Sequence, residues 1–189
     1  MTSLNKPHKP RKNSAFLHLM SIHWWMAGFY LILFMTGTPM AQLPREWLIR
    51  SLTYDFHKSI GTLVIALLVW RIVVLLRVWW RKYLKKPPKF TPLWWQKVCL
   101  HTTLYIFMCI VPISGLFFSN SFKSNNVKFF GIVLPDMFPE NEAMVDLGRN
   151  LHFWFAYTFL AFIILHIIHQ KKVAVSLWKK LRKRVAKVA

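Results

Sequence analysis

Residues 151–169 read "LHFWFAYTFLAFIILHIIH". This segment is long enough to cross a lipid bilayer, because a spanning helix needs about 20 mostly apolar residues. Its only acidic or basic side chains are three histidines. Ionisable groups inside membrane helices are rare and usually mark function. The segment therefore predicts a transmembrane helix whose histidines have a chemical role.

Three more apolar blocks accompany this one. Hydrophobic residues make up 55% of the 189-residue chain, and they occur in long blocks rather than in amphipathic alternation. The four blocks span residues 15–39, 56–79, 93–118 and 150–169. The first follows a basic stretch, as in a signal peptide, but it is too long for one and contains a histidine. We predict an all-α fold, a transmembrane four-helix bundle.

The charges alternate between the connections. The chain has a net charge of +20, and its basic runs lie before the first block, between the second and third, and after the fourth. All six acidic residues lie in the other two connections. This alternation predicts both termini in the cytoplasm. It also favours anionic lipid over nucleic acid as the partner of the basic runs. The predicted organisation is a basic tail (1–13), a four-helix domain (14–170) and a second basic tail (171–189).

The connection between the third and fourth blocks faces outward by this rule. It contains about 30 residues, which is long for a helical bundle. Its segment "GIVLPDMFPENEAMVD", residues 131–146, has two prolines and most of the acidic residues. We expect it to form a short irregular cap over the outer mouth of the bundle.

Four histidines fall into two pairs by depth. His152 and His166 are fourteen residues apart, about 21 Å along a helix and within roughly 40° of the same face. His23 lies about two turns into the first helix from the cytoplasmic side, so it shares the inner leaflet with His166. His57 and His152 both begin helices on the outer side. Two stacked histidine pairs are what two bis-histidine haems require.

The other histidines do not fit this scheme. His101 has no partner at its depth once His23 and His166 are paired. Two interpretations of His101 stay open: it contacts a quinone or a haem propionate, or it only packs against its neighbours. His169 points about 100° away from His152 and is expected beside the ligands or at the interface. His18 and His8 are expected to be solvated.

Three charged residues could hold anions. Lys58, next to His57, could attract a haem propionate, a quinone headgroup or superoxide, or could only reach the lipid headgroups. Arg149, three residues before His152, could pair with a propionate at the same rim. Arg71 lies deeper in the second helix and needs a partner there, for which a propionate of the inner haem is the first candidate.

A cofactor-free alternative stays open. Gly28 and Gly61 would let a porphyrin approach the helix backbone near His23 and His57, but small residues also mediate ordinary helix packing in membranes. In this alternative the histidines are polar packing groups of a basic protein that binds anionic lipid or a partner helix. It predicts a colourless protein.

Four stretches together resemble the bacterial cytochrome b561 family. "SIHWWMAGFYLILFMTG" resembles its first helix, with the ligand His23, and "FHKSIGTLVIALLVWRIVVLLR" its second, with His57. "HTTLYIFMCIVPISGL" is similar to the third helix, and "LHFWFAYTFLAFIILH" has the spacing of fourteen between the ligands of the fourth. The resemblance covers residues 14–178.

The resemblance implies a di-haem b protein of the bacterial inner membrane that exchanges electrons with quinone or quinol and a redox partner protein. His23 and His166 would hold one haem and His57 and His152 the other. Some members of the family oxidise superoxide and reduce quinone. The chain could also form a homodimer. An alternative is a cytochrome b subunit that anchors a larger oxidoreductase, of the hydrogenase or formate dehydrogenase type, in the membrane.

Overall fold

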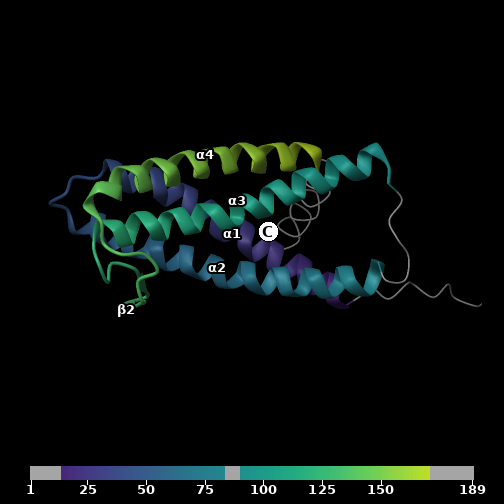
Figure 1. Ribbon diagram of the computed structural model, residues 1–189, viewed down its shortest axis with the longest axis horizontal. Coiled ribbons are helices and arrows are strands. Elements are labelled where there is room, and N and C mark those ends of the chain that lie inside the picture. Colours follow the sequence, from purple (N-terminus) through teal and green to yellow (C-terminus); the bar gives the residue numbers. More distant parts are fainter. Residues whose placement is uncertain (1–13, 84–89, 171–189) are drawn as a thin grey trace, which may run out of the picture. The chain divides into compact units, whose positions relative to one another are not determined.

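The part of the chain that the structure describes is mostly helical. The structure, a computed structural model, describes residues 14–83 and 90–170 (Figure 1). The helices are α1 (Ser14–Gln42), α2 (Leu48–Tyr83), α3 (Pro92–Phe122) and α4 (Val145–His169). The two predicted basic tails, residues 1–13 and 171–189, lie outside the described residues.

All four helices are long and apolar enough to cross a membrane. The spanning segments are Leu17–Gln42, Leu48–Trp80, Pro92–Phe122 and Glu142–His169. The prediction of an all-α protein with four transmembrane helices is therefore confirmed. The side of the membrane that each terminus faces stays a prediction.

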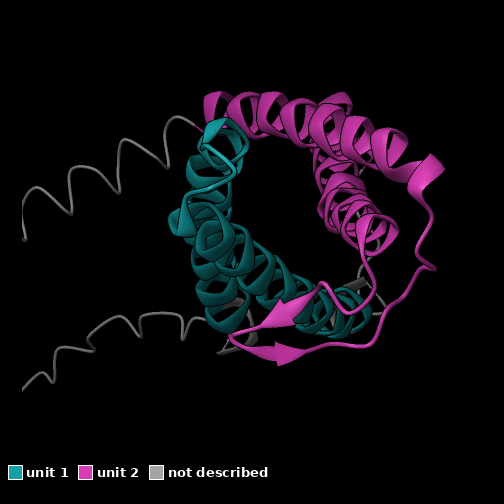
Figure 2. Cartoon of the chain, turned by 90° about the vertical axis from the view of Figure 1, so that its left-hand side faces the viewer, with its two compact units in different colours: residues 1–88 teal, residues 89–189 magenta. Residues whose placement is uncertain are grey.

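The chain divides into two compact units, residues 1–88 and 89–189 (Figure 2). In unit 1, α1 packs against α2, and in unit 2, α3 packs against α4. The core residues of unit 1 recur every fourth position on each helix, which places them on one face: they are Ile22, Met26 and Tyr30 on α1, and Ile60, Val64 and Leu68 on α2. Each unit is thus a helical hairpin held by apolar side chains.

The helices extend beyond the predicted apolar blocks. α2 begins at Leu48, eight residues before the second block, and α3 continues to Phe122. α3 begins after its N-cap residue, Thr91. The Thr91 hydroxyl accepts the backbone N–H of Trp94 at 3.2 Å, and Pro92 occupies the first turn. Hydropathy marks the part of a helix that lies in oil, whereas backbone hydrogen bonds continue until a cap or turn ends them.

The outer connection is more regular than expected. Strands β1 (Lys128–Phe129) and β2 (Ile132–Val133) form an antiparallel hairpin. Both residues of its turn have positive φ angles, 47° at Phe130 and 93° at Gly131, as in a type I′ turn. A 3₁₀-helix, Glu142–Met144, leads into α4. The expected irregular cap is therefore corrected to a hairpin followed by a helical turn.

Candidate functional site

In unit 1 the antiparallel register places two histidines opposite polar partners on the neighbouring helix. His23 on α1 lies opposite Arg71 on α2, with Nδ1 and Nη1 2.8 Å apart. His57 on α2 lies opposite Thr36 on α1, with Nδ1 and Oγ1 3.0 Å apart. Thirteen or fourteen residues separate the two levels on each helix, which is about 20 Å of helical rise.

Unit 2 has the same arrangement. His152 near the start of α4 contacts Val111 and Ser114 on α3. His166 near the end of α4 lies beside His101 on α3, with ring centroids 5.1 Å apart. His152 and His166 are again separated by about 21 Å of rise. Each hairpin therefore carries imidazoles at two levels, and the spacing of the levels is the same in both.

The contact at His57 fixes which ring nitrogen carries the proton. The Thr36 hydroxyl also lies 2.9 Å from the carbonyl oxygen of Ile32, to which it donates its hydrogen. Its oxygen must then accept the N–H at Nδ1 of His57. In the neutral ring this leaves a lone pair on Nε2. Gly37 completes the contact, because a Cβ there would lie 3.3 Å from Cε1 of His57.

The contact at His152 has the same chemistry. Nδ1 lies 3.0 Å from the carbonyl oxygen of Val111, which can only accept, so His152 donates from Nδ1 and keeps a lone pair on Nε2. The hydroxyl of Ser114 lies 3.3 Å from the same nitrogen and donates to Val111 itself. A Cβ at Gly115 would lie 3.0 Å from Cε1 of His152. The missing side chain lets the imidazole lie against α3.

His23 differs in its hydrogen bonding. A guanidinium has donors only, so Arg71 donates to Nδ1 of His23 and places the ring proton on Nε2. Ligation of iron through Nε2 requires the opposite tautomer, with the proton on Nδ1. His23 can bind iron through Nε2 as a neutral ligand only when Arg71 releases this contact. The sequence suggested a propionate as the partner of Arg71 and did not predict His23 in that place.

His166 has a neighbour that the sequence analysis did not foresee. The ring of His101 meets it edge to face, with an interplanar angle of 89°. Nδ1 of His101 donates to the carbonyl oxygen of Lys97 at 2.6 Å, which fixes the orientation of its ring. His101 was expected to lack a partner at its depth, and the structure places it in contact with His166.

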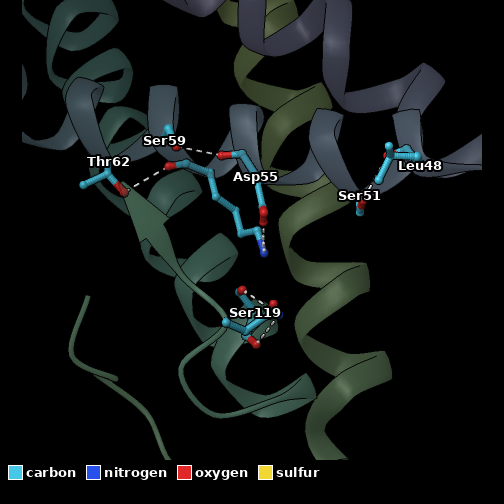
Figure 3. Close-up of polar contacts among 8 residues, drawn as sticks. Leu48, Ser51, Asp55, Ser59, Thr62 and Ser119 are labelled. Carbon is cyan, nitrogen blue, oxygen red and sulfur yellow. Dashed lines mark hydrogen bonds and ion pairs between the residues drawn. The ribbon is translucent and has the colours of Figure 1, made fainter. Parts of the chain in front are cut away.

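Lys58 and Arg149, two of the residues predicted to attract anions, each contact an acidic residue of their own helix. Lys58 lies 3.4 Å from Asp55, and Figure 3 shows Asp55 on α2 beside the hydroxyls of Ser59 and Thr62, which bond back to the α2 backbone. The guanidinium of Arg149 donates to Asp146 at 2.8 Å. Arg149 lies in the second turn of α4, whereas Lys58 lies ten residues after the start of α2, deeper than the sequence analysis placed it.

Arg149 and His18 have further ring contacts. The guanidinium carbon of Arg149 lies 5.6 Å from the ring centre of Phe118. His18, expected to be solvated, accepts the indole N–H of Trp70 at 3.0 Å within unit 1. A hydrogen-bonded pair of this kind is how polar side chains are satisfied within a membrane-spanning helix pair.

Sequence reasoning found the histidines but missed the residues that orient them. Thr36, Val111 and Ser114 carry no distinctive spacing, because hydroxyls and backbone carbonyls occur throughout helices. Gly115 was noticed only as part of the "PISG" stretch. The helical register could have identified Thr36. In an antiparallel helical hairpin, aligning residue 23 with residue 71 also brings residue 36 close to residue 57.

Two of the four predicted ligands, His57 and His152, fit a haem iron as they stand. His57 and His152 each fix their proton on Nδ1 and present Nε2, the form in which an imidazole binds a metal. At Gly28 and Gly61 a Cβ would meet nothing within 4 Å, so the helix surface is open there. The predicted pairs, His23 with His166 and His57 with His152, each join unit 1 to unit 2 and stay predictions.

In a comparison with known protein families, the sequence model of prokaryotic cytochrome b561 matches residues 17–179, which cover α1 from residue 17 onward and the whole of α2, α3 and α4. No curated protein matches the chain with significant similarity.

Proposed function

Because the chain belongs to the prokaryotic cytochrome b561 family, we propose that it is a di-haem b cytochrome that moves electrons across the membrane to or from the quinone pool. Membership of the family implies haem b and electron transfer in a membrane. The number of haems, the quinone and the redox partner are part of the proposal.

The equal spacing of the histidine levels in the two hairpins carries this proposal. Each unit has imidazoles at two levels, separated by about 20 Å of helical rise. In the proposed protein His23 and His166 hold the inner haem, and His57 and His152 hold the outer one. Two ligand levels of matching spacing, contributed by different hairpins, are what a stack of two bis-histidine haems requires.

Haem b, held by these four histidines, would supply one-electron redox chemistry. The residues of the chain hold those imidazoles in place. Thr36 and Val111 accept the Nδ1 protons of His57 and His152, which orients the rings and increases the basicity of Nε2. Gly37 and Gly115 leave room for the rings against the neighbouring helices.

In the proposal, cationic side chains supply positive charge near each haem. In the proposal Lys58 and Arg149 exchange their carboxylate partners for a propionate or another anion at the outer rim. An anionic substrate such as superoxide would be attracted to the same rim. Arg71 provides a positive charge at the level of His23, and His101 at the level of His166 is the candidate contact for a quinone or a propionate.

The proposed location is the bacterial inner membrane, with both termini in the cytoplasm. The positive-inside distribution of charge supports this orientation. The proposed partners are membrane lipid, quinone or quinol, and a redox protein, and a homodimer is compatible with the four spans. Anchoring a larger oxidoreductase would use the same four helices.

The test is the reduced-minus-oxidised visible spectrum of the detergent-purified protein, with haem quantified per chain. We expect a b-type spectrum and two haems per chain. His152→Ala should remove one haem, whereas His169→Ala should retain both. Protein that lacks haem after expression in haem-replete cells would contradict the proposal.

A second measurement separates the self-contained cytochrome from the anchor. Purified protein in lipid nanodiscs is mixed with quinol or with superoxide and quinone, and haem reduction is followed at the b-type band. Reduction by the isolated chain supports the proposal. A catalytic subunit that co-purifies in stoichiometric amount, together with an inert isolated chain, would instead support the anchor function.

A further inference from the structure

We propose that the β1–β2 hairpin is an interfacial anchor that inserts its apolar edge into the lipid headgroup region beside the end of α3. The edge consists of Phe130, Ile132, Val133 and Met137. This inference concerns the outer connection of unit 2 and is independent of the haem assignment.

The edge is exposed although Phe130, Ile132 and Val133 lie in an ordered hairpin; Met137 follows β2 by four residues. The exposed fractions are 61% for Phe130, 67% for Ile132, 47% for Val133 and 68% for Met137. Clustered exposed apolar residues of this kind mark an interaction with membrane or protein. Val127, at the base of the hairpin, is buried, and its carbonyl oxygen accepts the N–H of Leu134 at 2.9 Å. The hairpin is therefore anchored at its base and apolar at its edge.

The height of the hairpin matches the membrane boundary. The side-chain amide of Asn126 donates to the carbonyl and hydroxyl oxygens of Ser119, both at 3.2 Å. Ser119 lies within α3, one turn before its end and inside the segment apolar enough to span the membrane. In Figure 1 the hairpin lies level with the last turns of α3 along the long axis. The chain thus turns back to the helix end instead of extending into water.

The residue at the turn gives a second, independent indication that the hairpin contacts the lipid headgroup region. A type I′ turn favours asparagine or glycine at its first central position, because φ is positive there and a bulky side chain is strained. This chain places Phe130 at that position, with φ of 47°. The ring of Phe130 meets that of Phe129 edge to face, with centroids 5.0 Å apart, and is still 61% exposed, so it lies at the surface of the hairpin. The headgroup region is where aromatic side chains gather in membrane proteins.

Two acidic groups of the connection, Asp136 and Glu140, accept hydrogen bonds from its own polar groups. Asp136 accepts the side-chain amide of Asn120 and the backbone N–H of Asn125. Glu140 accepts the backbone N–H of Ser124 at 2.8 Å. The one cation within the strands is Lys128, whose long side chain can reach the phosphates while the edge enters the lipid. An apolar edge with a lysine beside it favours a lipid surface over a charged protein as the partner of the hairpin.

The test is site-directed spin labelling in nanodiscs of phosphatidylethanolamine and phosphatidylglycerol. Cys99 and Cys109 are first replaced by serine, and a nitroxide is attached to Phe130→Cys. Pro139→Cys, an exposed position of the same connection outside the spanning segments, is the matched control. Power saturation measures collisions of each label with oxygen, which partitions into lipid, and with a water-soluble nickel complex. Circular dichroism and size-exclusion chromatography confirm that each labelled protein is folded.

We expect the ratio of oxygen to nickel accessibility to be several-fold higher at position 130 than at position 139. An equal ratio at the two positions would place the hairpin in water and overturn the proposal. Low accessibility of position 130 to both reagents would also overturn it, because the edge would then be covered by protein. Repeating that measurement after dilution with unlabelled chain would distinguish a second copy from an intramolecular contact.

Discussion

Nδ1 of His57 lies 3.0 Å from the hydroxyl oxygen of Thr36, whose own proton is directed to the carbonyl oxygen of Ile32 at 2.9 Å. The hydroxyl therefore accepts from the ring, and His57 is held as the tautomer that presents Nε2. One threonine on α1 thus determines the chemical form of a histidine on α2.

Replacing Thr36 by valine keeps the shape and removes the acceptor. We expect haem retention at one site to weaken by about 10-fold or more, the usual effect of removing a group that orients a metal ligand. Thr36→Ser should restore it. Thr62→Val is the control, because the Thr62 hydroxyl bonds back to the Lys58 carbonyl oxygen at 2.9 Å. The amount of haem per chain measures the effect. Equal losses of haem in Thr36→Val and Thr62→Val would contradict the role of Thr36.

Adding one methyl group at Gly115 should displace His152. The new Cβ would lie 3.0 Å from Cε1 and 3.2 Å from Nδ1 of the ring. We expect Gly115→Ala to lose one of two haems and to destabilise the fold by about 1–3 kcal/mol, as overpacking does. Ile113→Ala, at a position that is 49% exposed on the same helix, should retain both haems. A Gly115→Ala protein with full haem content and unchanged melting temperature would count against the proposed ligand.

Arg71 should raise the reduction potential of one haem. A nearby positive charge disfavours the ferric state more than the ferrous state, so Arg71→Leu should lower one potential by tens of millivolts. Arg71→Lys keeps the charge and should retain most of that potential. Arg77→Leu, which removes an exposed arginine of the same helix, is the control. Spectroelectrochemical titration measures both haems separately, and a change of equal size in the Arg77 variant would show a non-local effect.

His101 should orient the ring of His166. The two rings meet edge to face, and the bond from His101 to the Lys97 carbonyl oxygen fixes the orientation of His101. In His101→Ala we expect a change in the electron paramagnetic resonance g-values of one low-spin haem, with both haems retained. His101→Phe, which keeps a ring, should restore them in large part. His169→Ala is the control, and unchanged g-values in His101→Ala would mean that the contact has no influence on the ligand.

The outer connection should loosen in acid. The backbone N–H of Ser124 donates to Glu140 and lowers the pKa of that carboxyl below its ordinary value of 4.5. A group whose pKa is lowered by folding stabilises the fold above the ordinary value and loses this contribution as pH falls through the lowered value. Protection of the Ser124 amide from hydrogen exchange, corrected for the intrinsic pH dependence, should therefore decrease only below pH 4.5.

Two variants give this pH dependence its controls. Glu140→Gln should lower the protection of Ser124 at neutral pH and remove its decrease in acid. Glu142→Gln changes an exposed acid of the same connection and should leave both unchanged. If the protection of the Ser124 amide still decreases in acid in Glu140→Gln, another carboxyl group causes the decrease.

The sequence by itself determined the four helices, because apolar blocks of spanning length have few other structures available in a bilayer. It also identified the histidines, since ionisable groups in such blocks are costly and conspicuous. Helix ends were less predictable. The polar residues at the start of α2 continue the helix because backbone hydrogen bonding does not depend on hydropathy.

Only the tertiary structure decided how the histidines are held. Thr36, Gly37, Val111 and Gly115 contact residues that are at least twenty positions away in the chain, and that proximity arises from the packing of α1 on α2 and of α3 on α4. The tautomers of His57 and His152, the contact of Arg71 with His23 and the hairpin of the outer connection follow from that packing. The physical reason is that hydropathy specifies which segments enter the membrane, whereas hydrogen bonds and steric contacts depend on which side chains the helix register brings together.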